Sequence, residues 1–128
     1  MPKKLVLVDD SAAVLMIADG ALEPLVEAGK IEFTTYDNPE NVLNDVKNGM
    51  IYDLLMTDIN MPQMSGFELV SALKQIPSVK SKPAIALTTE NSPEMKTEGK
   101  RVGLVGWLTK PFSDQKLQMS VKRVLRIK

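Results

Sequence analysis

Histidine and cysteine are both absent from the 128-residue sequence. Without cysteine the chain forms no disulfide and offers no thiolate ligand, and without histidine it has no imidazole ligand and no Ser-His-Asp triad. Nor can the chain carry a phosphohistidine. Any metal must therefore be held by oxygen atoms, and we expect a cytoplasmic location, which the lack of cysteine fits.

An excess of charge of either sign is also lacking, because 16 Lys and Arg balance 16 Asp and Glu. With no long basic run, binding of nucleic acid through bulk electrostatics is not expected. The apolar runs are far shorter than a membrane span, so we expect no membrane insertion and no secretory signal. Length and an apolar content of 44% predict one ordinary globular domain over residues 1–128.

Short apolar runs alternate with helical patterns five times along the chain. Strands are expected over 4–9, 31–36, 52–58, 84–88 and 104–109, and helices over 11–27, 38–49, 65–77, from 92 and over 113–126. Ser65 and Glu68 match a capping box, and the polar run 31–36 fits an edge strand. The alternation predicts an α/β fold of the flavodoxin-like class, a doubly wound (βα)5 three-layer sandwich with parallel strand order 2-1-3-4-5.

Polar residues close four of these apolar runs. They are Asp9 and Asp10, then Asp58, Thr88 and Lys110. Ligands of open α/β sheets bind at the carboxyl ends of the strands, so these side chains are expected to converge. Three carboxylates in one place repel one another unless a cation is present, and oxygen ligands suit Mg²⁺. An aspartate can accept a phosphoryl group, and a lysine and a hydroxyl can stabilise its oxygens.

Each of these residues also has a plainer interpretation. Asp9 and Asp10 could cap a helix, and Asp58 could be an acid in a loop. Thr88 could be an ordinary strand residue and Lys110 a solvated lysine. The combination at four strand ends is much rarer than any single member, which favours a shared site.

Four motifs carry a resemblance that covers essentially the whole chain. They are LVLVDDS, LLMTDINMPQMSGFEL, ALTTE and GWLTKPF, in that order. With these motifs the chain resembles the receiver domains of two-component response regulators. The stretch TTENSPEMKTEGKRVGLVGWLTKPF resembles in particular the stand-alone chemotaxis regulators of the CheY type.

The resemblance implies a role for each acidic residue. Asp58 would be the phosphoacceptor. Mg²⁺ would be bound by the side chains of Asp10 and Asp58 and by the backbone carbonyl of Asn60, with Asp9 supporting the metal through water. The identities of Asn60 and Glu90 match the CheY type and imply a short-lived phosphoryl group.

The resemblance also implies a switch that responds to the phosphoryl group. Lys110 would contact the acyl phosphate, and Thr88 would rotate inward to hydrogen-bond it. Trp107 stands at the position of the family's switch aromatic, although a core aromatic is an equally good interpretation. The Lys110–Pro111 bond would be cis, and Gly66 would permit a tight turn into the third helix.

The function that follows is a single-domain response regulator without an output domain, not a turnover enzyme. A histidine kinase or histidine phosphotransfer protein would supply the phosphoryl group. The surface of the fourth helix, fifth strand and fifth helix would then bind a partner, such as a flagellar motor switch or another output protein. Four lysines could flank this surface or be merely solvated: Lys96, Lys100, Lys116 and Lys122.

Other interpretations remain open at this point. A flavodoxin-like FMN protein shares the fold class, and an aspartyl phosphatase shares the nucleophile. A receiver that serves only as a phosphate sink shares all of the chemistry. The uninterrupted apolar run 12–18 indicates either a deeply buried helix or an exposed docking patch.

Overall fold

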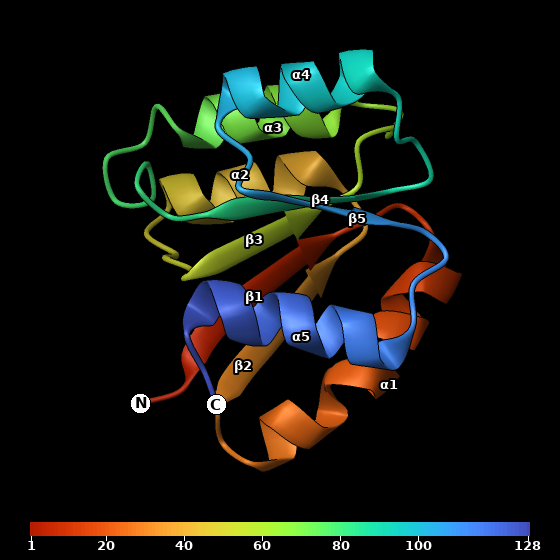
Figure 1. The fold of residues 1–128 in the computed structure, drawn as a ribbon. Coiled ribbons are helices and arrows are strands. Elements are labelled where there is room, and N and C mark those ends of the chain that lie inside the picture. Colours follow the sequence, from red (N-terminus) through yellow and green to blue (C-terminus); the bar gives the residue numbers. More distant parts are fainter.

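The computed structural model describes all residues from 1 to 128 as five strands that alternate with five helices (Figure 1). The strands are β1 (Lys3–Val8), β2 (Ile31–Tyr36), β3 (Leu54–Thr57), β4 (Ala84–Thr88) and β5 (Gly106–Thr109). The helices are α1 (Ala12–Glu27), α2 (Pro39–Lys47), α3 (Gly66–Leu73), α4 (Pro93–Val102) and α5 (Asp114–Leu125). Each strand is thus followed by one helix, as the alternation of the sequence predicts.

The five strands form one parallel sheet in the order β2-β1-β3-β4-β5. This order confirms the predicted fold class, and the polar strand β2 lies at an edge. β1 and β3 are neighbours, with Val8 opposite Thr57 at their carboxyl ends. The residues that follow these two, Asp9 and Asp58, therefore leave the sheet side by side.

Two helical layers cover the sheet, which makes a three-layer sandwich. α1 and α5 lie on one face, and α2, α3 and α4 lie on the other (Figure 1). The side chains of β1 alternate between the faces, so that Leu5 and Leu7 join the core under α1 and α5 while Val6 and Val8 join the other core. Because both faces are buried, the strand is apolar from Leu5 to Val8.

A polar side chain precedes every helix and binds its free backbone N–H groups. These N-cap residues are Ser11, Asn38, Ser65, Ser92 and Ser113. At α3 the predicted capping box is present, since the Ser65 and Glu68 side chains each accept a hydrogen bond from the other's backbone N–H. The helix starts expected from the sequence are therefore confirmed to within one residue.

Several predicted ends differ from the observed ones by two residues or more, and α2 ends at Lys47 rather than at residue 49. β5 begins at Gly106 rather than at residue 104, because the backbone N–H of Leu104 still donates to Gly99 O and completes the end of α4. β3 begins at Leu54 rather than at residue 52. α3 ends at Leu73, and the chain continues toward Pro77 in tighter turns such as the Ile76 N–H to Leu73 O bond.

No helix combines the length and the apolar character that crossing a membrane would require.

Candidate functional site

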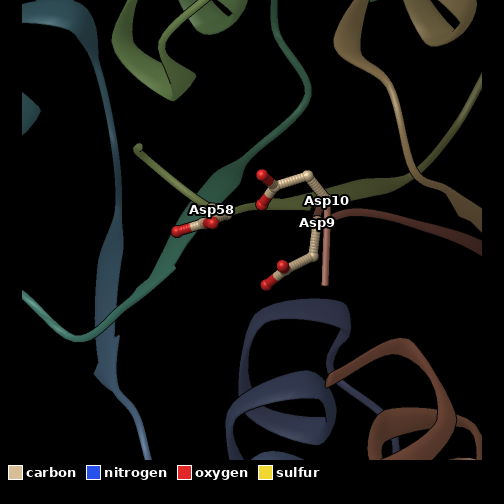
Figure 2. A group of neighbouring side chains, drawn as sticks. All are labelled: Asp9, Asp10 and Asp58. Carbon is tan, nitrogen blue, oxygen red and sulfur yellow. The ribbon is translucent and has the colours of Figure 1, made fainter. Parts of the chain in front are cut away.

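The acidic site lies at the carboxyl ends of β1 and β3. The backbone N–H of Asp58 donates to Val8 O at 2.9 Å, so the two strands stay paired up to the site. Carboxylate oxygens of Asp9, Asp10 and Asp58 all lie within 4.8 Å of one another. Figure 2 shows the three carboxyl groups on the same side of the strand ends. The convergence predicted from the sequence is therefore present.

Lys110 brings a positive charge to this group from the end of β5. Its Nζ lies 2.6 Å from Asp9 Oδ2 and 3.5 Å from Asp58 Oδ1. The Asp9 side chain is fully buried and that of Lys110 is 13% exposed, so this pair is shielded from solvent. The interpretation of Lys110 as a solvated surface lysine is therefore wrong.

The environment of Asp58 opposes its ionisation. Burial raises the pKa of its carboxyl group, and the negative charge of Asp9 raises the same pKa further. Lys110 and the backbone N–H of Ile59, which donates to Asp58 Oδ1 at 2.8 Å, lower the pKa in part. An added cation would favour the ionised form, so the electrostatics of the site suit a bound metal ion.

Asp9 and Asp10 do not cap α1. The N-cap is Ser11, whose hydroxyl accepts a hydrogen bond from the backbone N–H of Val14, and the first turn of α1 holds no acidic residue. Asp9 does accept a bond from the backbone N–H of Ser11 at 2.9 Å, while Asp10 is exposed. The capping interpretation is wrong for both residues, and their carboxylates belong to the acidic site instead.

The donor set fits a hard divalent cation. Three carboxylates and an exposed side offer oxygen ligands and room for water, which is how proteins commonly bind Mg²⁺. Asn60 lies two residues beyond Asp58 and is exposed. Its part as a backbone-carbonyl ligand stays a prediction.

Thr88 closes β4 and is fully buried. Its Oγ1 accepts a hydrogen bond of 3.2 Å from the backbone N–H of Glu90. The carbonyl of the same Glu90 accepts a bond of 2.9 Å from Nε1 of Trp107. This backbone link between Thr88 and Trp107 was missed from the sequence, because no side-chain pattern identifies a residue whose backbone N–H and carbonyl both bind side chains.

The comparisons with known proteins agree with this geometry. Residues 5–122 match the family described as response regulator receiver domain. The chain belongs to that family. The chemotaxis protein CheY of Pseudomonas aeruginosa is 28% identical to this receiver domain over 121 residues, which make up 94% of either protein.

Two further relatives place the receiver domain in different contexts. The structure of the chemotaxis protein CheY4 of Vibrio cholerae is 37% identical, superposes with a TM-score of 0.86 and covers 97% of this chain and 99% of that chain. The sensor histidine kinase CheAY of Helicobacter pylori is 31% identical over 94% of this chain. There the chain spans only 15% of the relative's length.

Other features expected of a receiver domain are also present. The Lys110–Pro111 peptide bond is cis, as the resemblance implied. A glycine is needed at position 66, but for space and not for a special turn conformation. A Cβ there would overlap the carbonyl oxygen of Asp58 and lie 3.0 Å from Cα of Ile59. The first turn of α3 thus approaches the backbone of Asp58 and Ile59 closely.

The apolar run at the start of α1 is mostly exposed. Met16 is 75% exposed and Ile17 is 53% exposed, whereas Ala18 is fully buried. Deep burial is therefore the wrong interpretation of this segment. Val14 and Ile17 also line an apolar hollow of about 330 Å³ that reaches Lys110. An exposed apolar surface thus borders the acidic site of this receiver domain.

Proposed function

We propose that the protein is a single-domain response regulator, with residues 1–128 as its receiver domain, and that Asp58 accepts a phosphoryl group from a phosphohistidine. One observation carries the proposal. Three carboxylates lie within 4.8 Å of one another, and the ammonium of Lys110 lies 3.5 Å from Asp58 Oδ1. Acids placed around a cation site with a fixed ammonium suit transfer of a phosphoryl group to a carboxylate.

The transfer uses the oxygen of Asp58 that makes no hydrogen bond to the protein. Oδ1 accepts the Ile59 N–H bond and faces Lys110, while Oδ2 has no hydrogen bond to the protein. No buried side-chain oxygen or nitrogen lacks a partner, so Oδ2 is open to solvent. In the transfer, Oδ2 attacks phosphorus, the P–N bond to the donor imidazole breaks, and the imidazole keeps that electron pair and takes up a proton.

The chain's own residues prepare this step. Bound Mg²⁺ would neutralise charge on the phosphoryl oxygens. The side chains of Asp10 and Asp58 and the carbonyl of Asn60 would be its protein ligands, and Asp9 would support it through water. Lys110 stabilises the phosphoryl group on Asp58 from the side of β5. The Thr88 hydroxyl, now bound to the Glu90 N–H, turns to one of the new oxygens.

The apolar start of α1 is the surface on which the phosphodonor docks. Exposed Met16 and Ile17 and the hollow beside Lys110 would contact a helical histidine kinase domain or a histidine phosphotransfer protein. Such contacts would hold the donor imidazole close to Asp58. Single exposed apolar residues are common on proteins, but a contiguous group next to a reactive site marks an interaction surface.

The output is a change in the surface formed by α4, β5 and α5. A groove of about 150 Å³ runs between α4 and β5, with Val105 and Trp107 on its strand side and the exposed Lys96 and Lys100 on its helix side. Exposed Lys116 and half-exposed Lys122 lie on α5. The CheY relatives support a role in chemotaxis, with a flagellar motor switch or another output protein as the partner.

The proposal describes a cytoplasmic signalling protein and not an enzyme that turns over an external substrate. Nucleic acid and membrane are not among the proposed partners. A phosphate sink would use the same site without an output partner. Binding of the phosphorylated and unphosphorylated forms to candidate output proteins distinguishes the two, because a sink binds neither.

The decisive test is labelling with acetyl phosphate. With Mg²⁺, the native chain should gain the mass of one phosphoryl group, and the gain should disappear when EDTA removes the metal. Asp58→Asn should show no gain, whereas Asp114→Asn, which changes an acid in the first turn of α5, should label normally. Undiminished labelling of Asp58→Asn would overturn the assignment.

A further inference from the structure

Trp107 is held between the sheet and α4. Its side chain is half-buried, its ring lies 6.4 Å from that of Phe67 on α3, and its Nε1 donates to the carbonyl of Glu90. It is therefore neither an ordinary core aromatic nor a freely exposed side chain. One hydrogen bond and the surrounding packing fix the direction of the indole.

Gly99 on α4 provides the space that the indole occupies. A Cβ at position 99 would lie 3.1 Å from Cζ3 of Trp107 and 3.0 Å from Cδ1 of Leu104, closer than carbon atoms normally pack. Glycine in a helix interior costs roughly 0.5–1 kcal/mol relative to alanine. The φ angle of Gly99 is not positive, so its backbone conformation does not require glycine. Close packing against Trp107, which supplies two of the three nearest atoms, and against Leu104 is the reason that remains.

The same indole is connected to the acidic site. Glu90 donates its backbone N–H to Thr88 Oγ1 and accepts the Trp107 N–H at its carbonyl. Thr88, the backbone of Glu90, Trp107 and Gly99 thus form a continuous series of contacts from the end of β4 to α4. A movement of the Thr88 hydroxyl breaks the first bond of this series.

We propose that Gly99 is a positioning residue for the switch, because its missing side chain lets the indole of Trp107 lie under α4 within reach of the Glu90 carbonyl. When Thr88 releases Glu90, the carbonyl, the indole and α4 shift together. This last step rests on the proposed function, whereas the packing of Trp107 against Gly99 does not.

Fluorescence tests the packing directly, because Trp107 is the single tryptophan of the chain. Gly99→Ala should shift the Trp107 emission to the red and increase its quenching by acrylamide, since the added methyl group pushes the indole outward. Gly20→Ala is the matched control, because it adds a methyl group within α1 that meets no atom within 4 Å. If Gly99→Ala gives the same spectrum and quenching as Gly20→Ala, the inference is wrong.

A double-mutant cycle separates steric packing from a general effect on α4. Trp107→Phe removes the ring atoms nearest to position 99 together with the indole N–H. In this background Gly99→Ala should be neutral or stabilising, because only the gain in helix propensity and a small adjustment of Leu104 remain. In the native background it should be destabilising. An equal loss of stability in both backgrounds would contradict a specific role for the indole.

Phosphorylation then tests the connection to the acidic site. Acetyl phosphate with Mg²⁺ should change the Trp107 emission of the native protein. Gly99→Ala should keep the mass gain on Asp58 and lose most of this spectral response. Normal labelling with an undiminished response would refute the role of Gly99 in the switch. Absence of labelling in the native protein would instead refute the proposed function, and the two preceding experiments would still decide the packing.

Discussion

The ammonium of Lys110 is the positive charge of the chain that lies against the acids of the site. It lies 2.6 Å from an oxygen of the buried Asp9 and also faces Asp58. A buried carboxylate that loses its only cation is left with an unbalanced charge. Lys110 therefore stabilises the metal-free site, and incoming Mg²⁺ must compete with it for Asp9.

Replacing Lys110 with methionine should separate these two effects. Lys110→Met keeps the apolar stem and removes the charge, so the metal-free protein should lose about 2 kcal/mol of unfolding free energy through the unpaired Asp9. Mg²⁺ should then raise the stability of the variant more than that of the native chain. Urea unfolding with and without Mg²⁺ measures both effects, and an equal increment from Mg²⁺ would contradict the competition.

Tyr52 predicts a specific loss of stability in alkaline solution. Burial raises its pKa to about 12, above the roughly 10 of an unfolded tyrosine. Between these values the folded state keeps a proton that the unfolded state has lost, so stability falls as the pH rises. This single group contributes up to about 1.4 kcal/mol per pH unit. Below pH 10 the tyrosine is protonated in both the folded and the unfolded state, so Tyr52 causes no loss of stability there.

Tyr52→Phe provides the control for this loss. The variant should lose stability less steeply between pH 10 and pH 12, because all lysines and Tyr36 remain and only one titrating group is gone. Denaturant midpoints measured across this range for both proteins give the comparison. Parallel curves would show that Tyr52 does not couple its titration to folding.

At the scale of elements, the junction between β3 and α3 is the tightest in the site. Gly66 donates its backbone N–H to Ile59 O at 2.8 Å, and a Cβ on Gly66 would overlap the Asp58 carbonyl. Gly66→Ala should therefore cost about 3 kcal/mol, the upper range for overpacking. It should also slow the labelling of Asp58, since the strand end must move.

A glycine in open space gives the opposite result. Gly20→Ala in α1 should stabilise the protein by about 0.5–1 kcal/mol through helix propensity alone. Thermal unfolding and acetyl phosphate labelling of the two variants make the comparison. If Gly66→Ala is as stable and as reactive as the native chain, the backbone between β3 and α3 can move to accommodate a Cβ at little cost, and the prediction is wrong.

The elements themselves were predictable because their signals are local. Ser65 with Glu68 determines where α3 starts, and Gly29, with a φ of 72°, follows the end of α1. The ends of helices and strands that depend on backbone hydrogen bonds or on distant contacts were not predictable from the local sequence. Leu104 has a strand-like sequence, yet its N–H belongs to the end of α4.

For the whole molecule, topology explains why the acidic site was visible in the sequence. Parallel strands place their carboxyl ends on one edge of the sheet, so Asp9 and Asp58 could be assigned to the same site before any distance was known. The Lys110–Asp9 pair and the position of Trp107 depend on how β5 and α4 pack. No local sequence pattern predicts this packing. The same holds for α1, where the sequence left both burial and exposure open.

Docking and chemistry should be separable in the intact molecule. Met16 lies on the exposed start of α1, while the reaction takes place at Asp58, so Met16→Lys should leave labelling by acetyl phosphate unchanged. Burial of such a side chain in a complex contributes roughly 1.5–3 kcal/mol. Phosphotransfer from a phosphohistidine protein should therefore slow on the order of tenfold or more at subsaturating donor.

The matched control is Met119→Lys on α5, which places the same charge at a methionine that is 52% exposed. It should receive phosphoryl groups from the protein donor at the native rate, because the proposed donor surface is α1. Rates of transfer from a phosphorylated histidine phosphotransfer protein, followed by loss of its label, give the measurement. If both variants slow equally, added charge and not the α1 surface is responsible. If neither slows, the donor docks elsewhere, and the exposure of Met16 and Ile17 needs another explanation.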